Sequence, residues 1–194
     1  MAEALSGEQP ASARQRILDN AYELFSRRGI RAVGVDEVIS RAAVAKATLY
    51  RHFPSKDDLV LAFLAQREQL WTREFVEAGA MERGTTAEER LLAIFDVFHD
   101  WFQRDDYEGC SFINVLLETC DRNHPIGAAS AQYLENIRTI VCSLAEEAGL
   151  RDPGEFALSW HILMKGAIVQ AAEGDGEAAQ RAKSMAQLLL ESHR

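Results

Sequence analysis

A short polar segment near the N-terminus carries the side chains with the clearest chemical capacity in this sequence. These side chains are Lys46, Thr48, Tyr50, Arg51, His52 and Lys56. Ammonium, hydroxyl, imidazole and guanidinium groups donate hydrogen bonds to phosphate oxygens, and an arginine can also donate two to the edge of a guanine. The chemistry that this spacing predicts is recognition of DNA, for which no cofactor is needed.

Helical patterns around this segment predict the elements that position it. Residues 36–42 are expected to form one short helix and residues 43–45 a tight turn, and a second helix is expected to begin near Lys46. Pro54-Ser55 then ends the second helix before a third one starts. This is the layout of a helix-turn-helix, whose second helix enters the major groove while neighbouring elements hold the phosphates.

The second helix of this motif has an inward and an outward face. Leu49 and Phe53 are expected to face the core. The outward positions are Ala47, Thr48, Tyr50 and Arg51. Thr48 and Arg51 are the candidates for reading base edges, and the small Ala47 lets the backbone approach the groove.

The segment Lys46-Ala47-Thr48-Leu49-Tyr50-Arg51-His52-Phe53, followed by Ser55-Lys56 and Asp58-Leu59, resembles the signature of the TetR family of bacterial transcriptional regulators. The resemblance extends from residues 14–29 to about Leu61. It implies a sequence-specific DNA-binding regulator, most often a repressor that a small-molecule effector releases from a pseudo-palindromic operator. It also implies phosphate contacts from Tyr50, His52 and Lys56. The residues expected to bind double-stranded DNA are then Lys46, Ala47, Thr48, Tyr50, Arg51, His52 and Lys56.

Three positions depart from the family pattern. Ala43 stands where the turn usually carries glycine, and Ala45 stands where serine is frequent. Val33-Gly34 replaces the threonine or serine that commonly caps the next helix and touches phosphate. If Ala43 needs a left-handed backbone, its side chain costs on the order of 1 kcal/mol. The motif tolerates these changes, but the hydroxyl at the cap is lost.

Charge is distributed unevenly along the chain. The net charge of all 194 residues is -9. Residues 14–56 nevertheless hold nine basic and four acidic side chains, whereas residues 57–194 hold twelve basic and twenty-four acidic ones. A basic N-terminal part on an acidic body predicts local binding of phosphates, with the body repelled from the duplex.

Helical periodicity dominates the chain, which is expected to be all-α with about nine helices. Residues 1–13 are expected to form a disordered lead-in, residues 14–58 the three-helix helix-turn-helix DNA-binding domain, and residues 59–194 a larger helical effector-binding and dimerisation domain. A long fourth helix, with Lys56 at its start and Leu59 and Phe63 on its apolar stripe, should end near Gly79.

The larger domain holds aromatic and polar side chains that together could line a small-molecule site. The candidates are Trp71, Phe75, Phe98, Phe102, Phe112, Asn114, Glu118, Trp160, His161 and Met164. The alternative for each aromatic side chain is the ordinary hydrophobic core. Asn114 and Glu118 lie four residues apart on one helix face, where they could orient an effector or bond to a neighbouring helix.

The last two helices, expected at residues 153–172 and 177–192, each carry a stripe of small and aliphatic side chains. Two such helices can pair with their copies in a four-helix interface, and the family resemblance implies a homodimer of this kind. The alternative is that both stripes pack only within one chain.

Other classes of function have weaker support. The sequence lacks the zinc-protease, nucleophile-elbow and phosphate-loop motifs, so no catalytic residue and no enzyme activity are expected. Two alternatives remain open: a metal- or thiol-responsive regulator on the same scaffold, in which Cys110 near a helix start could have a lowered pKa, and a helical protein-binding module without a DNA partner. With no apolar run of about 18 residues and no secretory signal, we expect a cytoplasmic protein without a membrane partner.

Overall fold

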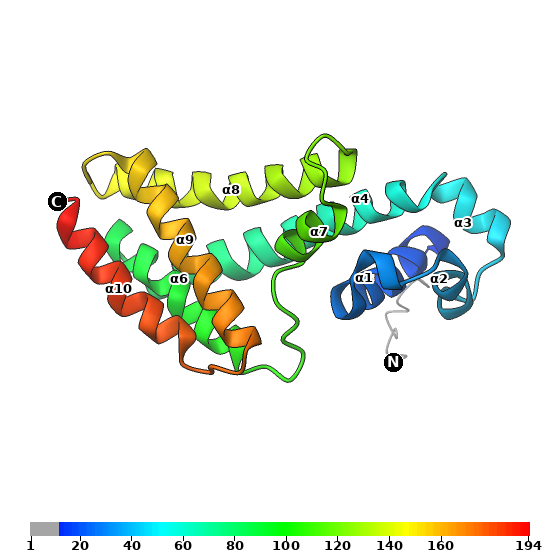
Figure 1. Ribbon diagram of the computed structural model, residues 1–194, viewed down its shortest axis with the longest axis horizontal. Coiled ribbons are helices and arrows are strands. Elements are labelled where there is room, and N and C mark those ends of the chain that lie inside the picture. The colour runs from blue at the N-terminus through cyan, green and yellow to red at the C-terminus, as the bar shows by residue number, and fades with distance from the viewer. Residues whose placement is uncertain (1–11) are drawn as a thin grey trace, which may run out of the picture. The chain divides into compact units, whose positions relative to one another are not determined.

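The computed structural model describes residues 12–194, which form helices and no strand (Figure 1). The expected all-α fold is confirmed. Most of the expected lead-in, residues 1–13, lies outside the described residues, but Ser12 caps the first helix by accepting a hydrogen bond from the Gln15 N–H at 3.2 Å. The chain divides into two compact units, Met1–Phe63 and Leu64–Arg194, so the division falls later than the expected boundary after residue 58.

The first unit contains α1 (Ala13–Ala32), α2 (Val35–Ala42), α3 (Lys46–His52) and the start of α4 (Lys56–Arg67). Apolar side chains of α1 are buried at helical spacing, and Gly29 interrupts its regular backbone with a φ of 76°. Phe63 closes this small core, because its ring packs edge-on against Tyr22 at 5.5 Å and Phe25 at 5.6 Å between centroids.

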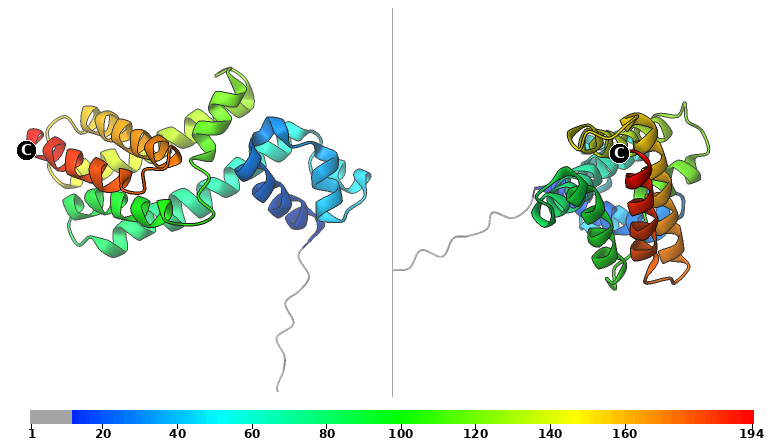
Figure 2. Two further views of the ribbon diagram at one scale, coloured as in Figure 1. Left: turned by 60° about the horizontal axis from the view of Figure 1, so that its bottom comes forward. Right: turned by 90° about the vertical axis from the view of Figure 1, so that its left-hand side faces the viewer.

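The second unit contains η1 (Glu68–Glu77), α5 (Ala78–Arg83), α6 (Ala87–Phe102), α7 (Ser111–Thr119), α8 (Pro125–Glu147), α9 (Pro153–Ala172) and α10 (Ala178–Ser192). Helix α10 lies beside α9 and α6 in each view (Figure 2). The core of the second unit is aromatic. The rings of Phe95 and Phe156 both contact the Trp160 ring in tilted arrangements, with 5.3 and 5.1 Å between ring centroids. No described helix has the length and apolar character that a membrane span requires.

Helices α4, η1 and α5 follow one another without a break, so the described residues form nine separate helical rods. The middle part, η1, is π-helical, a rare conformation often associated with functional sites. The expected helix end near Gly79 is wrong, because the rod continues to Arg83. Gly79 serves packing instead: a Cβ there would lie 3.0 Å from Cγ2 of Val97 on α6.

Candidate functional site

The turn between α2 and α3 forms without glycine. Ala43 adopts the left-handed conformation, with φ 51° and ψ 51°, and donates its N–H to the Ser40 carbonyl at 3.3 Å. Alanine in this conformation costs on the order of 1 kcal/mol. Gly34 caps α2 without a side-chain hydrogen bond. The local strain is therefore small enough for the helix-turn-helix to form.

Helix α3 presents its polar residues to solvent. Leu49 and Phe53 are buried, which fixes the opposite face outward and confirms the predicted orientation. Lys46, Ala47, Tyr50 and Arg51 are exposed, and Thr48 and His52 are half-buried. The Arg14 guanidinium lies over the Phe53 ring, 5.1 Å from its centroid, in a cation–π contact. This contact links the C-terminal end of α3 to α1.

The start of α4 is capped from within the chain. Ser55 donates its N–H and its hydroxyl to Asp58 at 2.9 and 2.6 Å, and the Asp58 N–H donates to Ser55 Oγ at 3.1 Å. The first turn also contains Asp57. These carboxylates reduce the positive potential that a helix N-terminus otherwise has. The ammonium of Lys56, rather than the helix terminus, is then the group able to hold a phosphate.

Ion pairs that the sequence alone did not reveal hold several basic residues of the first unit. Arg28 donates to Glu37 at 2.5 Å, and Arg41 pairs with Glu23. Lys46 lies 3.2 Å from Asp36, with both side chains mostly exposed. A DNA phosphate can replace Asp36 at Lys46, because an exposed ion pair contributes little. Only spatial proximity shows these pairs, since their members lie on different helices.

Comparison with known proteins agrees with this geometry. Residues 17–63 match the family model described as "Bacterial regulatory proteins, tetR family", and residues 87–186 match the "Tetracyclin repressor-like, C-terminal domain". The chain belongs to the TetR family. TetR-family proteins of this kind are DNA-binding transcriptional regulators and not enzymes.

Two of the relatives of this TetR-family chain match most of its length, and a third matches about half of it. The transcriptional regulator YjdC of Escherichia coli is 24% identical over 175 residues, covering 87% of this chain and 90% of YjdC. The crystal structure of SCO4454, a TetR-family regulator from Streptomyces coelicolor, superposes with a TM-score of 0.87 at 29% identity, covering 95% of this chain and 91% of that one. The repressor KstR of Rhodococcus jostii is 37% identical over 102 residues, 52% of this chain and 46% of KstR.

The residues expected to line an effector site in this TetR-family chain are mostly packed core. Trp71, Phe98, His161 and Met164 surround a space of only about 10 Å³, which is about the minimum for one water. The rings of Phe102, Phe112 and Trp160 are buried and Phe75 is half-buried.

The polar members of that expected set do not meet in a cavity. Asn114 is exposed and donates its amide to the Glu108 carbonyl at 3.4 Å, and Glu118 is half-buried on the same helix. His161 lines the small space just described. Its pKa is lowered to about 3, mainly by burial and to a smaller extent by the nearby positive charges of Lys165 and Arg138. The imidazole is therefore neutral at physiological pH.

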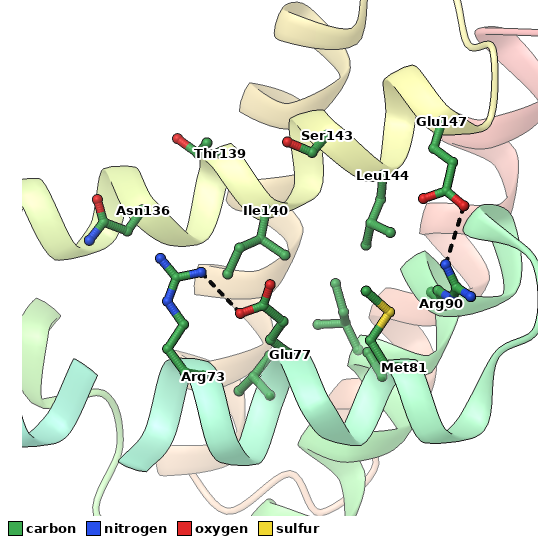
Figure 3. Close-up of a pocket in the computed structure, with 13 residues that line it drawn as sticks. Arg73, Glu77, Met81, Arg90, Asn136, Thr139, Ile140, Ser143, Leu144 and Glu147 are labelled. Atoms are coloured by element: carbon green, nitrogen blue, oxygen red, sulfur yellow. Dashed lines mark hydrogen bonds and ion pairs between the residues drawn. The ribbon is translucent and has the colours of Figure 1, made fainter. Parts of the chain in front are cut away.

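A larger cavity of about 280 Å³ lies between η1, α5, α6 and α8 (Figure 3). Its apolar wall consists of Val76, Ala80, Met81, Ile94, Ile140 and Leu144. Two ion pairs border it: Arg73 with Glu77 at 3.0 Å and Arg90 with Glu147 at 3.2 Å. The sequence does not reveal this site, because its wall is aliphatic and charged and no pattern along the chain joins η1, α5, α6 and α8.

The cysteines give the thiol-sensing alternative no support. Cys110 is buried, and burial raises the pKa of its thiol, which is the behaviour of an inert core cysteine and not the lowered pKa that the thiol-responsive alternative requires. Cys110, Cys120 and Cys142 are all free, and burial likewise raises the pKa of Cys142. Within residues 12–194, no group of histidine, cysteine and acidic side chains could hold a metal ion.

Alkylation should separate the cysteines. In the native protein at pH 8, we expect iodoacetamide to modify the exposed Cys120 at least about tenfold faster than Cys110, because only an accessible thiolate attacks. Peptide mass spectrometry over a time course measures both rates, and unfolded protein is the control in which the rates should converge. Rapid modification of Cys110 in the native protein would restore the thiol-responsive alternative.

Proposed function

We propose that this chain is a homodimeric repressor that binds a pseudo-palindromic operator and is released from it by a small-molecule effector. In this proposal residues 14–58 hold the DNA-binding function and residues 59–194 the effector-binding and dimerisation functions. The observation that carries it is the outward face of α3, where an exposed arginine stands among groups that donate to phosphates. Because the proposed operator lies in bacterial DNA, the protein would act in the cytoplasm.

The roles of the helix-turn-helix residues follow from their placement. Thr48 and Arg51 read base edges, and Ala47 permits close approach of the α3 backbone to the groove. The remaining groups, Lys46, Tyr50, His52 and Lys56, hold phosphates and fix the register without reading sequence. The tyrosine supports this division, since 41% of its surface is exposed although it is aromatic.

Dimerisation through α9 and α10 is supported by their unusual surface. Of the nine large apolar side chains exposed in the described residues, five lie on these two helices: Leu158, Ile162, Val169, Met185 and Leu188. Adjacent helices that both expose large apolar side chains suit a two-fold four-helix interface. A two-fold dimer reads two half-sites about 34–36 Å apart, or a multiple of that distance, so the operator has matching symmetry.

Release by an effector is proposed as a shift of populations. A ligand that binds better to a dimer whose heads do not fit the operator lowers DNA affinity by its difference in affinity between the two forms. The cavity in the second unit supports the existence of such a ligand, since it offers an apolar wall with a few charged groups.

Two single substitutions test the division between positioning and reading. Lys56→Ala should weaken binding to every duplex and make the slope of log affinity against log salt less steep by about two per dimer, because each chain loses one phosphate contact. Arg51→Ala should reduce discrimination against a changed operator base pair by about 1–3 kcal/mol. Fluorescence anisotropy with operator and scrambled duplexes between 50 and 200 mM salt, a range in which such slopes are steep, measures both effects. If the two variants behave alike on both duplexes, the proposed roles are wrong.

A further inference from the structure

One end of the cavity between η1, α5, α6 and α8 holds an arginine that is fixed independently of its ion-pair partner. Arg90 donates from Nε to the Gly84 carbonyl at 3.3 Å and from Nη1 to Glu147 at 3.2 Å. The Arg90 side chain is 24% exposed, whereas the Glu147 side chain is 56% exposed. The guanidinium thus keeps its place in the wall, while the glutamate can move into solvent.

A carboxylate from a ligand can take the place of Glu147. An ion pair with an exposed partner contributes little, so its replacement costs little. The guanidinium can donate two parallel hydrogen bonds to a planar carboxylate, which adds geometric selectivity. Glu147 is the last residue of α8, where the negative end of the helix dipole disfavours its charge.

The other end of the cavity does not favour an anion. Arg73 lies 3.0 Å from Glu77 and 3.6 Å from Glu68. Glu68 is buried and also accepts a hydrogen bond from Asn136 at 3.1 Å. Two carboxylates around one guanidinium leave an excess of negative charge, so a ligand carboxylate is directed to Arg90 instead.

The space between the two ends suits an aliphatic chain. Met81, Ile140 and Leu144 lie between the two ion pairs (Figure 3). Among the described residues, no aromatic side chain lines this cavity, so it offers no stacking surface for a ring. A volume of about 280 Å³ is close to the lower end of the range of small-molecule pockets, which is enough for a chain of medium length.

We propose that this cavity binds a medium-chain aliphatic carboxylic acid, whose carboxylate replaces Glu147 on Arg90 and whose chain lies against Met81, Ile140 and Leu144. The inference rests on the effector-responsive function proposed above and names the ligand class and the recognising residue. The wall that receives the chain includes η1, which continues directly from α4 along the sequence. The effector site is thus separate from the filled aromatic core.

Calorimetric titration of the full-length protein without DNA tests this proposal, with octanoate as the probe and octan-1-ol and octylammonium as matched controls. Octanoate is expected to bind at least about tenfold more tightly than either control, because only it makes the charge-assisted bonds to Arg90. Arg90→Gln should weaken octanoate binding at least about tenfold. Glu147→Gln should tighten it about two- to fivefold by freeing the arginine, and Arg73→Gln should leave it within about twofold.

Opposite outcomes overturn the proposal. These are no measurable octanoate binding, unchanged binding by Arg90→Gln, or a preference for octylammonium that Glu147→Gln abolishes. Circular dichroism first shows whether each variant folds. If Arg90→Gln does not fold, the Glu147→Gln variant tests the proposal, because Glu147 is exposed. Because the titration contains no DNA, its failure leaves the operator-binding proposal standing, and a failure to bind an operator leaves the titration interpretable.

Discussion

Replacing Phe63 with alanine is expected to abolish operator binding, although the ring lies in the protein core. Phe63 is fully buried and packs edge-on against Tyr22 and Phe25. Removing a buried phenylalanine costs about 3–5 kcal/mol through lost burial and the remaining cavity. Units of about 60 residues typically have a stability of only a few kcal/mol, so we expect this loss to unfold the first unit and to remove the support of α3.

Thermal unfolding followed by circular dichroism, together with fluorescence anisotropy on the operator, measures this effect. Tyr50→Ala is the matched control, because it removes an exposed aromatic ring of the same unit and should weaken DNA binding without changing the unfolding temperature. Phe63→Leu should restore most of the stability, because leucine fills much of the volume. If Phe63→Ala binds the operator as the wild-type protein does, the packing described for the first unit is wrong.

Replacing Ile162 with aspartate is expected to give a folded monomer whose operator affinity falls at least about 100-fold. Ile162 is 70% exposed on α9, so the substitution spares the fold of one chain. In the proposed interface the same position would bury two unpaired carboxylates, which costs several kcal/mol. The monomer then reads one half-site, and the second half-site no longer contributes.

Light scattering after size-exclusion chromatography measures the mass of the assembly. Leu117→Asp is the matched control, because Leu117 is 67% exposed on α7 and lies outside the proposed interface. That variant should stay dimeric and keep its operator affinity. A dimeric Ile162→Asp protein, or a monomeric Leu117→Asp protein, would move the interface away from α9 and α10.

The local signals in the sequence predicted much of the fold. The expected turn at residues 43–45 and the expected helix start near Lys46 agree with the structure, in which α2 ends at Ala42 and α3 begins at Lys46. The range expected for the helix at residues 153–172 coincides with α9, because Pro153 opens it and a glycine-rich turn follows it. These features depend on neighbouring residues, which is why periodicity, proline and glycine were sufficient.

Features that depend on distant residues could not be predicted in the same way. Gly79 suggested a helix end because glycine is common there, but it instead allows close packing against Val97 on α6. The aromatic residues gave the strongest signal for a pocket, yet Trp71 and Phe98 fill their own space. The cavity beside Arg90 depends on η1, α5, α6 and α8, which meet only in the folded unit. The sequence thus predicted which face of α3 points outward, whereas the cavity became visible only in the folded unit.

Selection from a random DNA library with the purified full-length protein, at near-physiological salt, is the most direct test of the central claim. The proposed dimer predicts enrichment of an inverted repeat whose half-site centres lie about one helical turn, 10–10.5 base pairs, or a multiple of that apart. Arg51→Ala should enrich the same repeat with a relaxed base preference. Enrichment of isolated half-sites, or of no sequence at all by a folded protein, would contradict the claim that two copies of α3 read a symmetric operator.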